Sequence, residues 1–180
     1  RLYESSPHHN AVFVGLDKYN KPRYANLRGL GTDFVGDASG SDKRFSFSIP
    51  ALGSDNVHLF ESAIDLLSYA TLVKINGGNW NREHLVSLAG VYKPKEELQE
   101  SSMPLALKRY LSEHPSIRFI TLRLDNDATG GRAAKALVSM LSDRYEVSVQ
   151  PPPYGKDYND YLCMRLGLPI THRKGKAQER

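Results

Sequence analysis

The sequence contains one cysteine among its 180 residues, and this scarcity excludes a disulfide framework within the chain. A single thiol, Cys163, can form neither an internal disulfide nor a cysteine-rich zinc site. It lies in the apolar stretch 161–164, which favours a small, buried hydrophobic side chain. A reducing, cytoplasmic compartment is therefore expected.

Long hydrophobic runs are also lacking. No apolar stretch approaches the roughly 20 residues that a helix needs to span a bilayer, so no membrane partner is expected. The amino-terminal residues show no charged-then-apolar pattern of a secretion signal. The chain begins at Arg1 rather than at a methionine, and we expect it to be part of a longer protein with flanking domains.

Charge of one sign does not dominate the composition. The 24 Lys and Arg residues exceed the 20 Asp and Glu residues, which leaves a net charge of +4. This mild excess is compatible with a polyanionic partner but does not identify one. Part of it belongs to residues 169–180, which we expect to form a disordered basic tail.

The order of apolar patterns predicts an α/β fold. Residues 11–50 alternate like strands, with a hairpin from 11–16 and 22–28 and a further strand at 44–49. Beyond them, strand patterns alternate with helical ones, which is typical of a parallel sheet covered by helices. The predicted strands are 57–60, 84–88, 117–124 and 145–149. The predicted helices are 61–73, 103–113, 130–141 and 157–166.

This pattern divides the chain into three parts. A β-rich basic segment covers residues 1–52, an α/β domain with a parallel sheet of about four strands covers residues 53–168, and the tail covers residues 169–180. We find no internal repeat and no low-complexity segment.

Acidic residues follow three of the predicted strands, in pairs at Glu61 and Asp65, at Asp125 and Asp127, and at Asp157 and Asp160. Ligands of open parallel sheets gather at the carboxyl ends of the strands, so these pairs are expected at one edge. Carboxylates that are brought together repel, and a divalent cation relieves that repulsion. Mg²⁺ prefers oxygen ligands and is usually held by one or two carboxylates plus phosphate oxygens.

A structural alternative exists for each pair taken singly. An acidic residue at a helix start often only caps the helix. The glycine pair Gly130–Gly131 is expected to allow a tight turn that leaves backbone N–H groups free for an anion. The joint occurrence of three acidic pairs in one β–α order favours the metal hypothesis over capping alone.

Three motifs resemble those of the Toprim family, and they cover roughly residues 57–162. They are Phe-Glu-Ser-Ala-Ile-Asp at 60–65, Leu-Asp-Asn-Asp-Ala-Thr-Gly-Gly-Arg-Ala-Ala at 124–134, and Gly-Lys-Asp-Tyr-Asn-Asp-Tyr-Leu at 155–162. The likeness is strongest to the primase branch and to the Toprim proteins of plasmids and conjugative elements. Two departures, Ser62 in place of the usual Gly and the extra residue Thr129, remove no carboxylate.

The resemblance implies a Toprim, Rossmann-like fold and a set of functional residues. Glu61, Asp125 and Asp127 are the expected catalytic residues. The expected ligands of Mg²⁺ or Mn²⁺ are Glu61, Asp65, Asp125, Asp127 and Asp157.

Basic residues supply the expected nucleic-acid contacts. Arg28, Lys43 and Arg44 lie in glycine-rich stretches of the N-terminal segment, where primases carry a basic region near the template. Lys156, in the third motif, is added to this group. The alternative is a solvated hairpin with ordinary surface charge.

Three functions remain open. The first is a primase-like nucleotidyltransferase for DNA replication or mobile-element transfer, which uses single-stranded DNA and nucleotides. The second is a Toprim nuclease, in which Glu61 acts as general base. The third is a non-catalytic nucleic-acid-binding module of a larger protein. Tyr92 and Tyr154 could act as nucleophiles only beside a base or metal, and neither is preferred.

Overall fold

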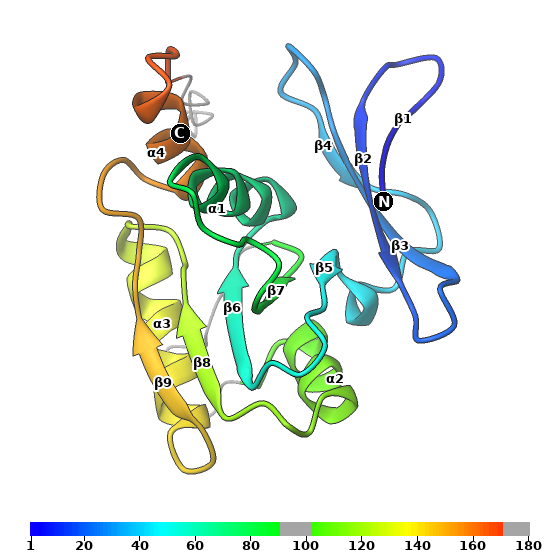
Figure 1. Ribbon diagram of the computed structural model, residues 1–180. Coiled ribbons are helices and arrows are strands. Elements are labelled where there is room, and N and C mark those ends of the chain that lie inside the picture. Colours follow the sequence, from blue (N-terminus) through cyan, green and yellow to red (C-terminus); the bar gives the residue numbers. More distant parts are fainter. Residues whose placement is uncertain (91–101, 171–180) are drawn as a thin grey trace, which may run out of the picture.

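The computed structural model describes residues 1–90 and 102–170, and two sheets organise them (Figure 1). Tyr92 and the charged end of the basic tail, residues 171–180, lie outside the described residues. A small antiparallel sheet comes first in the chain, and a mostly parallel sheet with helices follows it. The predicted α/β class with a β-rich N-terminal segment is confirmed.

The first sheet has four antiparallel strands in the order β1-β2-β3-β4. Their bounds are β1 Leu2–Glu4, β2 Ala11–Leu16, β3 Pro22–Arg28 and β4 Val35–Asp37. The predicted hairpin of β2 and β3 is confirmed, with Phe13 opposite Asn26. The short strands β1 and β4 were not predicted, because three residues carry too little alternation to stand out from loop sequence.

The second sheet has five strands in the order β5-β7-β6-β8-β9. Their bounds are β5 Ser48–Ile49, β6 Asn56–Phe60, β7 His84–Ser87, β8 Phe119–Leu122 and β9 Glu146–Val149. Strands β6 to β9 are parallel, as predicted, and β5 pairs antiparallel with β7 at one edge.

The predicted strand at 44–49 is wrong in its first half. Residues Lys43–Phe45 form a short 3₁₀ helix, η1, because the Asp42 side chain accepts a hydrogen bond from the backbone N–H of Arg44. Such local bonds from Asp to the backbone compete with strand pairing. Only Ser48 and Ile49 remain for β5.

Four helices cover the parallel sheet: α1 Ala63–Ile75, α2 Leu105–Glu113, α3 Ala128–Leu141 and α4 Tyr158–Arg165. Residues of β6 alternate between two cores. Val57 and Leu59 pack with residues of α2 and α3, whereas Phe60 packs with residues of α1 and α4. In the described residues no helix has both the length and the apolar character that a membrane crossing requires.

The N-terminal sheet packs against the helical domain through aromatic contacts and a close backbone approach. The rings of Phe13 and Phe47 meet edge to face with centroids 5.9 Å apart. A Cβ atom on Gly15 would lie 1.6 Å from the carbonyl oxygen of Phe45, so only glycine fits at this contact. This packing fixes the N-terminal sheet beside the helical domain.

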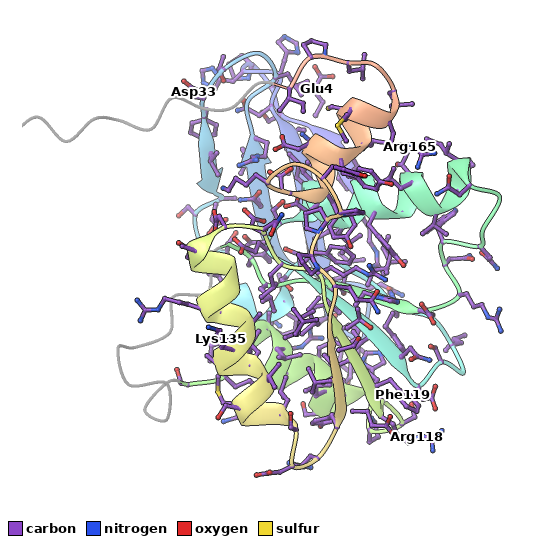
Figure 2. The ribbon with its side chains drawn as sticks, turned by 90° about the vertical axis from the view of Figure 1, so that its left-hand side faces the viewer. Glu4, Asp33, Arg118, Phe119, Lys135 and Arg165 are labelled. Atoms are coloured by element: carbon purple, nitrogen blue, oxygen red, sulfur yellow. The ribbon has the colours of Figure 1, made fainter. Side chains whose placement is uncertain are left out.

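The loop between β3 and β4 lies at the same end of the molecule as the carboxyl end of β8 (Figure 2). Figure 2 shows Arg118 and Phe119 at the amino end of β8, and Asp33, from the β3–β4 connection, at the opposite end. The N-terminal sheet thus borders the carboxyl edge of the parallel sheet.

Candidate functional site

Glu61 and Asp125 lie side by side at the carboxyl edge of the parallel sheet. Glu61 directly follows β6 and Asp125 follows β8, the neighbouring parallel strand. The backbone N–H of Asp125 donates a long hydrogen bond of 3.4 Å to Oε1 of Glu61. The sheet therefore joins two acidic residues that are separated by 64 positions in the chain.

Both carboxyl groups are difficult to ionise in this position. Glu61 is only 6% exposed, and burial, followed by the nearby charge of Asp125, raises its pKa to about 7. Burial also raises the pKa of Asp125, although the ammonium of Lys156 works in the opposite direction. Negative charge at this edge is unfavourable without a cation.

Asp127 has one oxygen committed to helix capping. It precedes α3, and its Oδ1 accepts a hydrogen bond of 2.9 Å from the N–H of Gly130. This bond lowers the pKa of Asp127. The anion site expected at Gly130 and Gly131 is therefore wrong. The N–H of Gly130 is used by the Asp127 side chain, and the N–H of Gly131 donates to the Asp127 carbonyl at 2.9 Å. Neither glycine N–H is left free for an anion.

Asp157 is likewise a capping residue, and it accepts a hydrogen bond of 2.8 Å from the N–H of Asp160 at the start of α4. Asp65 lies beside it and is buried. The Ser62 hydroxyl donates to Oδ2 of Asp65 at 2.5 Å, and the N–H of Asn159 donates to its Oδ1 at 3.4 Å. Burial, and then the charge of Asp157, raises the pKa of Asp65 to about 7. Asp65 thus links the start of α1 to the start of α4.

The ammonium group of Lys156 lies between the two acidic residues of the second motif. Its Nζ is 3.1 Å from Oδ2 of Asp125 and 3.5 Å from Oδ2 of Asp127. Burial opposes the charged form, but the hydrogen bonds and negative charges of Asp125 and Asp127 together outweigh it and raise the pKa of Lys156. Lys156 was predicted to contact nucleic acid, and in this structure it faces the carboxylates.

The carboxylates fit Mg²⁺ or Mn²⁺ in the chemistry of their donors. Glu61, Asp125 and Asp127 offer only hard oxygen atoms, which these cations prefer. Within residues 1–90 and 102–170, however, no three His, Cys, Asp or Glu side chains are already arranged to hold a metal ion. The donors therefore suit an ion that takes one or two carboxylates and completes its shell with water and phosphate.

A cleft of about 290 Å³ separates the basic N-terminal sheet from the carboxyl edge of the parallel sheet. Arg28 and Lys43 line one wall, and the other wall includes Ser62, the residue after Glu61. Lys43 is also paired with Asp37 at 3.4 Å. The remaining lining residues are Tyr24, Asn26, Val35, Gly36, Asp37, Phe47, Ala63, Ser87, Ala89 and Gly90.

Arg44 differs from its neighbour Lys43. Its Nε donates to both carboxylate oxygens of Asp42, at 3.0 and 2.9 Å, and its Nη2 donates to Oδ2 at 2.7 Å. Arg44 is not among the residues that line the cleft. The structure thus brings Arg28 and Lys43 to the cleft and leaves Arg44 outside it.

Two polar residues of the cleft were missed in the sequence. Tyr24 and Asn26 lie on β3 at alternate positions with Arg28, so all three side chains share one face. The Tyr24 hydroxyl donates to Asp37 at 2.7 Å, and the Asn26 amide donates to the same oxygen at 3.0 Å. The period-two pattern of β3 shows that these side chains share one face of the strand. It does not reveal which face of the strand meets the second domain.

Comparison with families by sequence profile divides the chain into two matched regions. The profile of a family described as Toprim-like matches residues 58–162. The profile of a family described as a protein of unknown function (DUF3991) matches residues 1–54. No curated protein matches the chain.

Solved structures with a similar fold include primases. The primase fragment of the bacteriophage T7 primase-helicase protein aligns with a TM-score of 0.62 at 15% identity, over 92% of this chain and 61% of that chain. A DNA primase domain from Pseudomonas aeruginosa aligns with a TM-score of 0.54 at 15% identity, over 91% of this chain and 52% of that chain. The chain thus spans about half to three fifths of these two proteins.

A third similar structure contains ligands. It is described as the bacteriophage T7 lagging-strand DNA polymerase interacting with primase domains bound to an RNA/DNA hybrid and dTTP. The TM-score is 0.54 at 15% identity, over 92% of this chain and 76% of that chain. At such identities the likeness establishes the fold, which is an antiparallel N-terminal sheet followed by a Toprim-like α/β domain.

Proposed function

The chain belongs to the Toprim-like family, whose profile covers residues 58–162, and from this premise we propose that it carries out Mg²⁺-dependent nucleotidyl transfer in a primase-like protein. The proposed setting is DNA replication or the transfer of a mobile element, with single-stranded DNA as template and nucleotides as substrates. The fold shared with primases supports this choice.

The observation that carries the proposal is the cleft between the two sheets. Its basic wall presents Arg28 and Lys43, and its opposite wall begins at Ser62, next to Glu61. Cationic side chains bind phosphate oxygens without reading sequence, so the basic wall can position a nucleic-acid backbone. A strand held there would contact Ser62, the residue next to Glu61.

The residues proposed to hold the metal ion are Asp125, Asp127 and Glu61, with Asp65 and Asp157 behind them. Asp65 and Asp157 are engaged in capping and in the link between α1 and α4, so their contribution is to place the other three. When bound, Mg²⁺ would supply positive charge that screens phosphate oxygens and orients an incoming nucleotide.

Glu61 is the proposed general base. A group that exchanges protons in catalysis works best when its pKa lies near the working pH, and in the metal-free site burial raises the pKa of Glu61 to about 7. Its position beside the cleft wall allows it to take a proton from a 3′-hydroxyl group. The same chemistry directed at water would give a nuclease.

The test offers two substrates to the chain within its full-length parent protein, each with Mg²⁺ or Mn²⁺. One is a single-stranded DNA template with nucleotides, and the other is a labelled strand that reports cleavage. Extension of a new strand is the expected result. Cleavage without extension would replace the primase-like function with the nuclease. Binding with neither reaction would leave only a nucleic-acid-binding module.

A further inference from the structure

Lys156 has a fixed backbone and a half-exposed tip. Its N–H donates to Oδ2 of the buried Asp160 at 2.9 Å, and its carbonyl accepts a hydrogen bond of 2.6 Å from the N–H of Asn126. Gly155 precedes it with φ of +78°, and a Cβ atom there would lie 2.6 Å from Cβ of Asp160. The side chain of Lys156 is nevertheless 48% exposed.

This backbone anchoring directs the ammonium group to the two carboxylates. Nζ lies 3.1 Å from Asp125 and 3.5 Å from Asp127, so one positive charge serves both side chains. A divalent cation that used the same two oxygen atoms would be repelled by the ammonium at such short range. The ammonium and the cation therefore compete for Asp125 and Asp127.

The flexible side chain of Lys156 allows its ammonium group to leave the two carboxylates. Four methylene groups let the ammonium move while the backbone stays in place, and a phosphate group is a strong alternative partner. We propose that Lys156 is a built-in counter-ion that holds Asp125 and Asp127 against divalent cations until a phosphate-bearing ligand attracts its ammonium group. This inference rests on the proposed metal site.

The first consequence is that Lys156 lowers the affinity for the metal ion in the absence of a phosphate ligand. Lys156→Met keeps most of the stem and removes the charge. In calorimetric titration with Mn²⁺ alone, this variant should bind at least about tenfold more tightly than the unaltered protein. Lys156→Arg, which keeps the charge, should remain near the unaltered affinity.

A matched control removes a lysine that is remote from the carboxylates. Lys135 lies on the exposed outer side of α3 (Figure 2). Lys135→Met changes the net charge by the same amount as Lys156→Met but should leave Mn²⁺ affinity within about twofold. A gain of equal size in both variants would show that net charge alone sets the affinity, and it would refute the counter-ion.

The second consequence is cooperativity between metal and phosphate. A nucleoside monophosphate at millimolar concentration should increase the Mn²⁺ affinity of the unaltered protein several-fold. It should have a much smaller effect on Lys156→Met, because no ammonium has to move. An equal effect in both proteins would contradict the phosphate-dependent release.

A metal-free measurement tests the ion pairs separately. The free energy of unfolding in the presence of a chelator is compared for Lys156→Met in two backgrounds, the unaltered chain and the double variant Asp125→Asn with Asp127→Asn. The loss caused by Lys156→Met should be clearly larger where the two carboxylates are present. An equal loss of unfolding free energy in both backgrounds would show that Lys156 forms no stabilising ion pair with Asp125 and Asp127, and it would contradict the proposal.

The outcomes separate this inference from the proposed function. Equal Mn²⁺ affinity of the unaltered protein and Lys156→Met overturns the competition and leaves the metal site intact. If neither protein binds Mn²⁺, both the metal site and the competition fail. The titrations involve no turnover, so a failure to extend a DNA strand leaves the counter-ion result unaffected.

Discussion

The guanidinium of Arg123 donates a hydrogen bond of 2.7 Å from Nη1 to the hydroxyl of Tyr158. Arg123 lies two residues before Asp125, and Tyr158 directly follows Asp157. The guanidinium also lies 4.2 Å from the ring centre of Tyr69 on α1. One half-buried cation thus connects the loop after β8 with the start of α4, next to two acidic segments of the site.

Tyr158→Phe is expected to destabilise the protein by about 1–2 kcal/mol, because it removes the acceptor for Arg123 and the donor to the Gln150 carbonyl at 3.0 Å. Urea unfolding measures the change. Tyr154→Phe is the matched control, since Tyr154 is 63% exposed, and it should change the stability by less than about 0.5 kcal/mol. Equal effects of the two substitutions would mean that the two hydrogen bonds of the Tyr158 hydroxyl contribute nothing to stability.

The neighbouring glycines of α3 should respond in opposite ways to alanine. A Cβ atom on Gly130 would lie 2.1 Å from the carbonyl oxygen of Asp125, so Gly130→Ala should cost on the order of 1–3 kcal/mol. Gly131 has open space around it, so Gly131→Ala should stabilise the helix by about 0.5–1 kcal/mol. Thermal unfolding of both variants checks this. Gly130→Ala should also weaken Mn²⁺ binding, because the strain falls on the backbone of Asp125.

The stability of the metal-free protein should decrease as the pH rises through about 7. Burial raises the pKa of Glu61 from an ordinary value of 4.5 to about 7, so the folded state favours the protonated form. The resulting stabilisation is fully present below about pH 4.5 and is lost as the pH rises through the folded pKa, a change on the order of 3 kcal/mol.

Replacement of Glu61 separates its contribution from that of other groups. Glu61→Gln cannot ionise, so urea unfolding at pH 5 and pH 8 should give a smaller difference than in the unaltered protein. Glu146→Gln, at an exposed position of β9, should leave the difference unchanged. An unaltered pH dependence in Glu61→Gln would assign the effect to other groups such as Asp65.

The two basic residues of the cleft should dominate the salt dependence of single-strand binding. Arg28→Ala combined with Lys43→Ala removes two phosphate contacts and should lower the slope of log affinity against log salt by about 1.4. Arg44→Ala removes one positive charge from a residue outside the cleft that pairs with Asp42, and it should change the slope by far less than the ~0.7 expected for each cleft residue. Fluorescence anisotropy at several salt concentrations measures both. A larger change in Arg44→Ala would place the bound strand beside Arg44, outside the cleft.

Catalysis should depend on the charge of Glu61. Glu61→Gln keeps the size and hydrogen bonding of the side chain but cannot accept a proton. Turnover should fall about a hundredfold or more, the usual scale for a positioned acid or base. Affinity for nucleic acid should stay the same or increase, because a negative charge near the phosphates is removed. Unchanged turnover would exclude Glu61 as the base.

Prediction from sequence succeeded where period and chain order carry the information. The apolar runs of β6 and β8 and the Ala- and Leu-rich composition of α3 identified the parallel sheet and one of its covering helices. The same order placed Glu61 and Asp125 at one edge, because parallel strands end on the same side.

Prediction from sequence failed where a single local hydrogen bond or a tertiary contact determines the local structure. The hydrogen bond from Arg44 N–H to Asp42 forms η1 in place of a strand, and the cap by Asp127 uses the N–H expected to bind an anion. The position of Lys156 depends on a local bond to Asp160, four residues later, and on a bond to Asn126 from the loop after β8. No periodic pattern encodes such contacts.

The neighbouring positions of β6 and β8 have a consequence for the order of folding. Glu61 and Asp125 are 64 residues apart, and they meet only when β8 inserts beside β6. Contacts of such long sequence separation close late and slowly, because a large loop must be ordered first. A nascent chain that has emerged only through β7 carries Glu61 without its neighbour. The site is therefore assembled only after β8 and Asp125 have been synthesised, and a nascent chain that ends before β8 does not possess it.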